Sequence, residues 1–240
     1  MSEVARSTRD GGERSTGGRL RGAYLRFHHA RVREASDHPL VHMRRMLGDV
    51  ARARSDGGLL CDVGAGVEGS RPEQWTGRRV SIDLAAARGV DVVADGHALP
   101  MRDKSAAAVV LMEVLEHVPT PLGLLRECAR VLETGGFLCL TAPQYCILHG
   151  HPGDYYRYTN QGLDYLCREV GLRIVDVRAT GGPALVLFHA IERNLHPRLR
   201  LPFVAAVYRL SDWLDGRVFG HGNRPGVVDA VGWAVRAVKA

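Results

Sequence analysis

The chain has 240 residues and a formal net charge of +6 at pH 7. A chain of this length can bury a substantial core, which excludes a small fold held together by disulfides or a structural metal. Its five cysteines are an odd number without a C-x-x-C pair, so we expect reduced core residues in a cytoplasmic protein.

The positive charge is concentrated in the two flanks of the chain. Residues 1–34 and residues 189–240 each hold eight Arg or Lys against four acidic residues. Basic flanks suit contact with nucleic acid or with an anionic membrane surface, and they equally suit plain solvation. Because no basic strip is interleaved with aromatic residues, nucleic acid is not the expected partner.

The first segment in chain order, residues 1–35, is rich in Gly, Ser, Thr and Arg and predicts a disordered basic arm. It contains no apolar run, so we expect neither a signal peptide nor a transmembrane helix there. Residues 38–54 repeat apolar side chains at helical spacing, with Asp37 as the expected N-cap and Pro39 in the first turn. This pattern predicts a helix that packs beside a sheet.

Strand-like and helix-like segments then alternate along the chain. Strands are predicted at 59–63, 79–83, 90–94, 107–112, 136–142 and 172–178, and helices at 70–76, 120–133 and 160–170, the last with Thr159 as N-cap. The alternation predicts an α/β fold with a parallel, doubly wound, Rossmann-like sheet. Ligands of such sheets bind beyond the carboxyl ends of the strands, so we expect one crevice lined by Asp62, Asp83, Asp95, Glu113 and Pro143.

The C-terminal part differs from this alternation. Residues 184–216 predict two amphipathic helices broken near Pro197 and Pro202. Residues 231–239 predict a last edge strand, and a helix is the alternative there.

The stretch DVGAGVEG, residues 62–69, has the G-x-G-x-x-G spacing of a dinucleotide-binding turn, and Asp83 follows about twenty positions after the first glycine. The carboxylate of Asp62, however, would repel a pyrophosphate about 4 Å away by roughly 4 kcal/mol at an effective dielectric of about 20. S-adenosylmethionine has no phosphate and carries an ammonium and a sulfonium, which an aspartate attracts. We therefore expect S-adenosylmethionine rather than NAD, and a turn without a ligand is the alternative.

Five motifs in order resemble those of class I S-adenosylmethionine-dependent methyltransferases, in the type 11-like small-molecule group. They are LLCDVGAGVEG, SIDLA, VVADGHALPMRDKS, VVLMEVLEHVPTP and LRECARVLETGGFLCLTAP, and the resemblance covers roughly residues 59–180. One departure is Glu68, which stands where many members have a third glycine. The resemblance implies a methyltransferase with the class I fold and a helical insertion before the last strand.

The resemblance also implies roles for single residues. Asp83 would accept hydrogen bonds from both ribose hydroxyls, and Asp95 would contact the adenine amino group. The whole expected cofactor-binding set is Asp62, Gly64, Ala65, Gly66, Asp83, Leu84, Asp95, Gly96, His97, Met112 and Glu113. His117, expected to open a helix that faces the crevice, is the candidate general base because histidine titrates near neutral pH. A histidine that only caps the helix or lines the pocket is the alternative.

The loop HGHPGDYYRYT, residues 149–159, resembles a substrate loop of many members of this group. The candidate substrate-binding residues are His149, His151, Tyr155, Tyr156 and Arg157. For Tyr156 and Tyr158, packing under the following helix is the alternative.

Two other interpretations remain open. Glu113, Glu116 and His117 form E-x-x-E-H, whose spacing would put them on one helical face, and this resembles metal-dependent 2′-O-methyltransferases that act on small RNA. His149 or His151 would then be a fourth ligand. We assign no metal here, because the same letters occur in metal-free relatives. The other interpretation is a non-catalytic S-adenosylmethionine-binding module, which only the Glu68 departure supports.

The expected function is methyl transfer from S-adenosylmethionine to a small-molecule, sugar or lipid-linked acceptor, most simply a hydroxyl. We divide the chain into the arm at 1–35, a catalytic domain at 36–183, a helical insertion at 184–224 and the final edge strand at 225–240.

The insertion combines an apolar set with a basic set: Leu185, Leu187, Phe188, Phe203, Val207, Trp213 and Leu214, with Arg193, Arg198, Arg200 and Arg209. This combination suits a helix lying on the inner membrane face, and it equally suits a buried lid or a homodimer contact. The sequence leaves open the oligomeric state, a peripheral membrane contact, and whether the acceptor atom is O, N or C.

Overall fold

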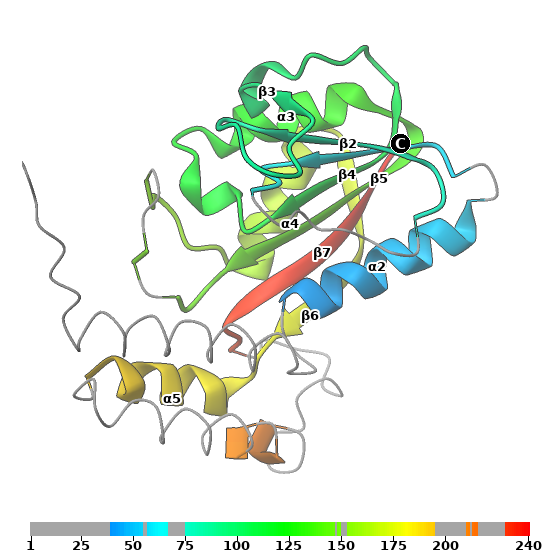
Figure 1. Cartoon of the computed structure of the whole chain (residues 1–240). Coiled ribbons are helices and arrows are strands. Elements are labelled where there is room, and N and C mark those ends of the chain that lie inside the picture. The colour runs from blue at the N-terminus through cyan, green and yellow to red at the C-terminus, as the bar shows by residue number, and fades with distance from the viewer. Residues whose placement is uncertain are drawn as a thin grey trace, which may run out of the picture.

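A seven-stranded sheet with helices on both faces forms the centre of the molecule (Figure 1). The computed structural model describes residues 39–54, 57–66, 75–146, 148–149, 153–194, 210–211, 213–215 and 229–240. The strands are β1 (Leu59–Val63), β2 (Arg78–Asp83), β3 (Val92–Val93), β4 (Ala106–Met112), β5 (Leu132–Pro143), β6 (Leu172–Thr180) and β7 (Gly232–Lys239). The predicted α/β, Rossmann-like architecture is confirmed, although the strand predicted at 90–94 is shortened to β3.

The order of the strands locates the ligand-binding edge of the sheet. It is β3-β2-β1-β4-β5-β7-β6, so the chain first builds outward from β1 to β3 and then returns to place β4 on the other side of β1. Strands β1 to β5 pair in parallel. Open α/β sheets bind their ligands at such a reversal, beyond the carboxyl ends of the strands.

Strand β7 runs antiparallel between β5 and β6, so the prediction of a last edge strand is wrong. The strand is buried through Trp233, Ala234 and Val235, whereas burial alternates along β6, which forms the edge of the sheet. A short apolar run that is buried on both faces is typical of a central strand. The sheet is therefore mixed rather than fully parallel.

One face of the sheet is covered by α2 (Pro39–Ala53), as predicted from residues 38–54. Its side chains Met43, Met46, Leu47 and Val50 are fully buried, at the spacing of one helical face. They pack with residues of β1, β4, β5 and β7 in one apolar cluster.

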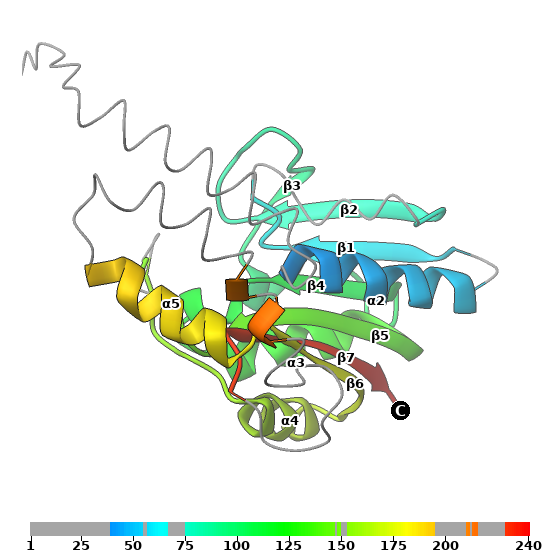
Figure 2. The same cartoon turned by 90° about the horizontal axis from the view of Figure 1, so that it is seen from below.

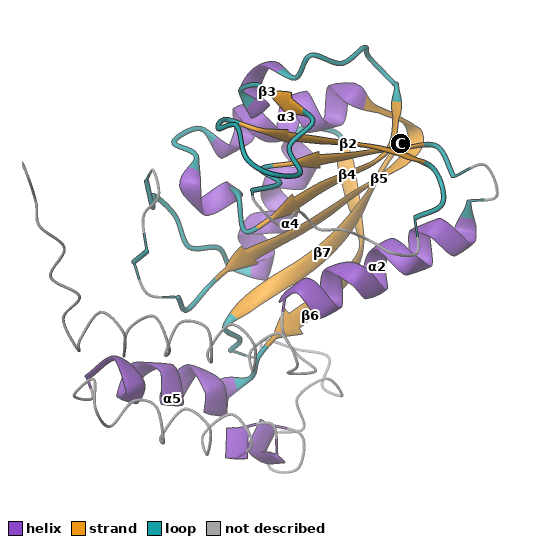
Figure 3. Ribbon diagram, in the orientation of Figure 1, coloured by secondary structure: helices purple, strands orange, loops and turns teal. Residues whose placement is uncertain are grey.

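The opposite face is covered by α3 (Pro121–Val131) and α4 (Asn160–Glu169), as Figure 3 shows. Leu124, Leu125 and Leu163 are buried there in the larger apolar cluster of the sheet. The helix predicted at 120–133 ends at Val131, because Leu132 is already extended and begins β5. All five cysteines are free, and all except the partly exposed Cys146 are buried, which agrees with the expected reduced core residues.

Helix α5 (Pro183–Asn194) lies apart from these layers, beyond the carboxyl ends of the parallel strands (Figures 1 and 2). The buried carboxylate of Asp215 accepts hydrogen bonds from the backbone N–H groups of Gly182, at 3.1 Å, and Ala184, at 2.9 Å. A Cβ on Gly182 would lie 2.4 Å from the carboxyl carbon of Asp215, so only glycine fits there. An aspartate distant in sequence thus satisfies the start of α5.

Several predictions fall on residues outside the described part of the chain. They are the arm at 1–35, the N-cap Asp37, most of the helix at 70–76, the breaks near Pro197 and Pro202, and most of the second helix of 184–216. Among the helices that the structure describes, none is both long and apolar enough to cross a membrane.

The predicted N-cap of α4 is confirmed, and it can be tested by mutation. The Thr159 hydroxyl accepts a hydrogen bond from the N–H of Gly162 at 3.0 Å. We expect Thr159→Ala to lower the free energy of unfolding by about 1 kcal/mol, because one N–H at the helix start loses its partner. Urea unfolding measures this loss. Thr159→Ser keeps the hydroxyl and should stay within about 0.5 kcal/mol of the wild type; equal losses in both variants would contradict the capping role.

Candidate functional site

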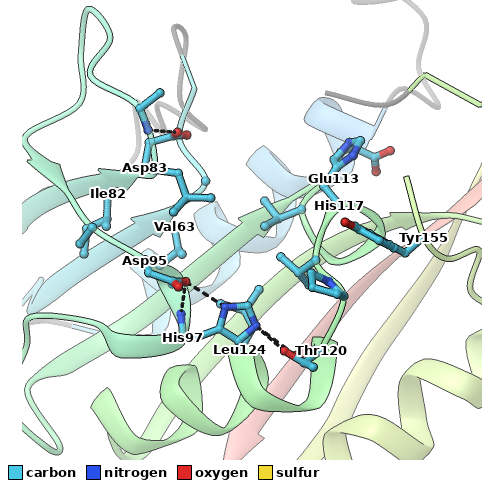
Figure 4. A pocket seen from close by; sticks show the side chains of 18 residues that line it. Val63, Ile82, Asp83, Asp95, His97, Glu113, His117, Thr120, Leu124 and Tyr155 are labelled. Carbon is cyan, nitrogen blue, oxygen red and sulfur yellow. Dashed lines mark hydrogen bonds and ion pairs between the residues drawn. The ribbon is translucent and has the colours of Figure 1, made fainter. Parts of the chain in front are cut away.

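A cavity of about 960 Å³ opens at the carboxyl ends of β1 to β4 (Figure 4). Asp83 and Asp95 lie on one side of it, and Glu113 and Tyr155 lie on the other. The structure thus brings together three of the five residues expected in the crevice. Asp62 and Pro143 are not among the residues that line the cavity.

The first wall of the cavity is the glycine turn after β1. Gly64 has a φ of 71° and Gly66 a φ of 56°, a region that glycine adopts without strain. The N–H of Gly64 donates to the carbonyl of Ile82 at 2.8 Å, which ties the turn to β2. A Cβ on Gly64 would lie 2.5 Å from Cγ2 of Val114, whereas a Cβ on Gly66 would meet no atom within 4 Å. Gly64 is therefore required for packing, and Gly66 leaves open space beside the backbone.

Asp83 ends β2 with its carboxylate held by the backbone. Its Oδ2 accepts the N–H of Gly66 at 2.8 Å, and its Oδ1 accepts the N–H of Ala85 at 3.0 Å. An ionised carboxylate offers about four acceptor positions, so each oxygen can still accept a hydrogen bond from a ligand. The neighbouring Leu84 also lines the cavity and is 63% exposed.

Asp95 and His97 form a hydrogen-bonded pair after β3. Oδ1 of Asp95 accepts the backbone N–H of His97 at 2.8 Å and lies 2.9 Å from Nδ1 of the same residue. The backbone hydrogen bond is the main cause that lowers the pKa of Asp95, so its carboxyl group is ionised. Nε2 of His97 lies 2.9 Å from Oγ1 of Thr120, which sequence reasoning did not single out. This chain of contacts fixes the imidazole against the start of α3.

Four residues of the predicted cofactor-binding set do not line the cavity: Asp62, Ala65, Gly66 and Met112. Asp62 is buried inside β1, where it is in register with Ser81 of β2 and Val110 of β4. Ala65 is buried in the glycine turn, and Met112 is the last residue of β4. The structure therefore places these side chains away from the cavity surface.

The cavity is acidic. Asp83, Asp95 and Glu113 line it, and no Lys or Arg is among the described residues that do so. A concave surface with this charge attracts a cation and repels a phosphate. The donor set therefore fits the ammonium and sulfonium of S-adenosylmethionine and does not fit the pyrophosphate of NAD.

The E-x-x-E-H segment is not on one helical face, so that prediction is wrong. Glu113 follows β4 with a φ of 54°, and the segment Leu115–His117 is a single 3₁₀ turn. His117 consequently does not open a helix, because α3 begins only at Pro121. A non-glycine residue at positive φ costs of the order of 1–3 kcal/mol and is typical of functional sites. The N–H of Glu113 donates to Oγ1 of Thr141 at 3.1 Å, and burial raises the pKa of its carboxyl group.

Glu116 points into the protein beside His117. Its side chain is fully buried, and neither carboxylate oxygen has a hydrogen-bond partner among the described residues. Burial, followed by the charge of Glu113, raises the pKa of Glu116 to about 8. Nε2 of His117 lies 3.7 Å from Oε1 of Glu116, which is too long for a hydrogen bond.

The loop after β5 packs against this segment. The N–H of Tyr155 donates to the carbonyl of Glu116 at 2.7 Å, and the hydroxyl of Tyr156 donates to the carbonyl of Pro119 at 2.9 Å. The buried hydroxyl of Tyr158 donates to the carbonyl of Leu115 at 2.9 Å, so Tyr158 has the packing role considered as an alternative. Of the candidate substrate-binding residues, Tyr155 lines the cavity.

Arg157 and His149 both contact Asp154, which sequence reasoning missed. The guanidinium of Arg157 contacts both carboxylate oxygens of Asp154, at 2.5 and 2.8 Å. These hydrogen bonds hold the pKa of Asp154 well below its usual range. The backbone N–H of His149 donates to the same carboxylate at 3.0 Å. The only sequence signal for this cluster is the spacing of three residues between Asp154 and Arg157; His151 lies outside the described residues.

The packing of the glycine turn gives a second prediction. Gly64→Ala should lower the free energy of unfolding by roughly 1–3 kcal/mol more than Gly66→Ala, because only the first places a Cβ against Val114. Both variants carry a similar cost of positive φ, so the difference isolates the steric contact. Urea unfolding of the two variants gives both values. Equal stability losses would show that the turn has room at Gly64.

Comparison with known proteins shows what the central part of the chain resembles. Residues 62–140 match the family model Methyltransf_11, described as a methyltransferase domain. A ubiquinone biosynthesis O-methyltransferase from Xanthomonas campestris pv. campestris is 56% identical over 34 residues, which cover 14% of this chain and 14% of that protein. The chain therefore aligns with only about a seventh of the length of the curated relatives that it matches.

Solved structures share the fold. A protein named as a sarcosine dimethylglycine methyltransferase from Galdieria sulphuraria superimposes with a TM-score of 0.56 and 17% identity, over 87% of this chain and 86% of that one. The 1,6-didemethyltoxoflavin-N1-methyltransferase of Burkholderia thailandensis, bound to S-adenosylhomocysteine, gives a TM-score of 0.52 and 12% identity, over 98% and 93% of the two chains. These identities show the fold alone. Residues 62–140 therefore resemble a methyltransferase domain of the type 11 family, and the fold is that of the class I S-adenosylmethionine-dependent methyltransferases.

Proposed function

We propose that the protein transfers a methyl group from S-adenosylmethionine to a hydroxyl of a small molecule. The observation that carries this proposal is the cavity itself, which is acidic, lacks Lys and Arg among its described lining residues, and has two chemically different ends. The glycine turn, Asp83 and the Asp95–His97 pair make one end. Glu113, His117 and Tyr155 make the other (Figure 4).

The first end has the groups that hold the cofactor in our proposal. Asp83 keeps two acceptor positions beside an open cavity, which suits the two hydroxyls of a ribose. Asp95 is ionised, and its hydrogen bonds with the described residues use Oδ1, which leaves Oδ2 for the amino group of an adenine. The sulfonium of S-adenosylmethionine supplies an activated methyl group, so the protein has mainly to orient the acceptor and to help remove its proton.

The second end has groups that suit a hydroxyl acceptor. Nδ1 of His117 lies 2.6 Å from the carbonyl oxygen of Gly153, which makes Nδ1 the donor and leaves a lone pair on Nε2. This lone pair can take the hydroxyl proton directly, which is the predicted base role, or it can bind a cation that lowers the pKa of the hydroxyl. The short match to an O-methyltransferase supports oxygen as the accepting atom.

The cofactor assignment predicts a loss of affinity on changing Asp83. Asp83→Ala should weaken S-adenosylmethionine binding by roughly 1.5–3 kcal/mol, because charged hydrogen bonds to the ribose would be lost. Isothermal titration calorimetry measures this change. Asp164→Asn on α4, a change of another partly exposed aspartate outside the cavity, is the matched control and should bind as the wild type does. Tight binding of NAD, or an unchanged affinity in Asp83→Ala, would overturn the assignment.

We further propose that the acceptor is bulky or lipid-linked and is met at a membrane surface. Helix α5 lies beyond the carboxyl ends of the parallel strands, as does the cavity (Figures 1 and 4). Leu187 and Ile191, one turn apart on α5, are 59% and 40% exposed, and Trp213 in the segment joined to α5 through Asp215 is 58% exposed. Exposed apolar side chains of this kind suit the interface of a bilayer. The arginines expected beside them have side chains outside the described residues.

This surface can be tested with vesicles. The wild-type protein should sediment with vesicles that contain anionic phosphatidylglycerol. The double variant Leu187→Ser/Trp213→Ser should remain in solution, because it loses the two most exposed apolar side chains that the structure describes in this segment. Tyr165→Ser on α4 removes a side chain of similar exposure, 62%, and should sediment as the wild type does. A wild-type protein that stays in solution with anionic and neutral vesicles alike would exclude the membrane contact.

A further inference from the structure

We propose that Glu116, His117 and His149 bind a first-row divalent transition-metal ion, of the zinc type, at the acceptor end of the cavity. One candidate ligand atom from each of the three side chains lies within 4.8 Å of the others. The binding claim stands on these residues alone. Only the purpose of the ion, described below, rests on the proposed methyl transfer.

The candidate ligand atoms lie slightly farther apart than the ligand atoms of an occupied zinc site. Donors that share one zinc ion lie about 2.0–2.2 Å from it, which places them roughly 3–3.5 Å from each other in a tetrahedral arrangement. Nε2 of His117 and Oε1 of Glu116 are 3.7 Å apart, too far for a hydrogen bond and close enough to share an ion. The rings of His117 and His149 meet edge to face with their centroids 4.9 Å apart. His149 is on a loop, where a small shift is least costly.

Glu116 is the residue that most requires a partner. Its side chain is 0% exposed, and both of its oxygens are without a hydrogen-bond partner among the described residues. An ionised carboxylate that is buried without a hydrogen-bond donor is strongly destabilising. In its ionised form the carboxylate is not satisfied by a histidine nitrogen that carries a lone pair, because both groups are then acceptors. A cation between them satisfies both groups at once.

The surrounding residues orient the ligands as outer residues do in metal sites. The contact of Nδ1 of His117 with the carbonyl oxygen of Gly153, at 2.6 Å, leaves Nε2 as the ligand nitrogen and fixes the ring. His149 lies against Asp154, whose Oδ2 is 3.6 Å from Nδ1 of the ring and accepts the backbone N–H at 3.0 Å. Asp154 is in turn fixed by Arg157.

The donor set selects the kind of ion. Two imidazoles with one carboxylate suit zinc and its first-row neighbours, whereas magnesium and calcium prefer oxygen ligands. Glu113 is not within the three-residue cluster, since its positive φ turns the chain away from the helical arrangement that its spacing suggests. Three protein ligands leave a coordination position open, as in catalytic zinc sites. Of the three ligands, His117 lines the cavity, so the site adjoins the space for the acceptor.

An ion at this position would activate the hydroxyl group of the acceptor. A hydroxyl that approaches the open position would have its pKa lowered by the ion, as water does on zinc. In the transfer, the acceptor oxygen forms the new O–CH₃ bond while the S–CH₃ bond breaks and its electron pair stays on sulfur. The hydroxyl proton leaves to water. His117 then serves as a ligand, because a nitrogen bound to the ion cannot accept that proton.

The test uses the full-length protein, without a histidine tag, after removal of metal with a chelator. Titration with Zn²⁺ alone in a calorimeter should show one site per chain. Glu116→Gln and His149→Gln should each weaken this site by at least about 10-fold. His97→Gln replaces a cavity histidine outside the cluster and should leave the affinity unchanged. Co²⁺ in place of Zn²⁺ should give visible absorption bands in the wild type that both ligand variants lose.

The outcomes separate this inference from the proposed function. Absence of a Zn²⁺ site in the wild type, or equal affinities in the wild type, Glu116→Gln and His149→Gln, would overturn it. His149 is exposed on a loop, so His149→Gln keeps the test decisive even if Glu116→Gln fails to fold, which circular dichroism detects. S-adenosylmethionine titrated into the same preparations is the separate readout. Zn²⁺ binding without S-adenosylmethionine binding would reject the proposed function alone, and the reverse would reject the metal site alone.

Discussion

The hydrogen bonds between the segment after β4 and the loop after β5 determine the shape of the acceptor end. Three of them run from Tyr155, Tyr156 and Tyr158 to the carbonyl groups of Glu116, Pro119 and Leu115. A fourth joins the ring of His117 to the carbonyl group of Gly153. Each uses a backbone carbonyl of irregular chain, which has no helix or strand partner of its own. These bonds hold the two segments together, so the positions of His117 and Tyr155 depend on both.

The two ends of the cavity are built in different ways. At the cofactor end, Asp83 and Asp95 are oriented mainly by backbone N–H groups of the turns that follow the strands. At the acceptor end, loop side chains such as His117 and Tyr155 form the wall. Loops carried on a rigid sheet tolerate changes that strand ends do not. This division suits a fold that keeps one methyl donor and varies the methyl acceptor.

The architecture and the cofactor end could be predicted from local patterns. The strand β4 is a run of apolar residues that is buried as far as Leu111, and Thr159 before α4 is a residue type that caps helices. The place of β7 could not be predicted with the same rules used for its neighbours. Pairing between β5 and β7 depends on contacts far apart in sequence, although the apolar run from Trp233 to Val235 favours a central position.

The acceptor end was less predictable because its geometry departs from regular structure. The spacing of Glu113, Glu116 and His117 indicates a helical face only if the backbone is helical, and the positive φ of Glu113 breaks that condition. Asp154 carries no motif, yet its carboxylate joins Arg157 to His149. Contacts of this type depend on how two loops pack against each other. The sequence pattern of one loop alone does not predict them.

The position of β7 has a consequence for the order in which the molecule can assemble. Among the described strands, β6 pairs with β7 alone, and β7 comes after α5 and the segment around Asp215 in the chain. The amine of Lys239, its last residue, also binds the carbonyl groups of Ala129 and Leu132, where α3 passes into β5. During synthesis on the ribosome, β6 and the apolar surface under α4 therefore remain without their sheet partner until β7 has been made. The sheet is completed only when β7, the last strand in the chain, inserts between β5 and β6.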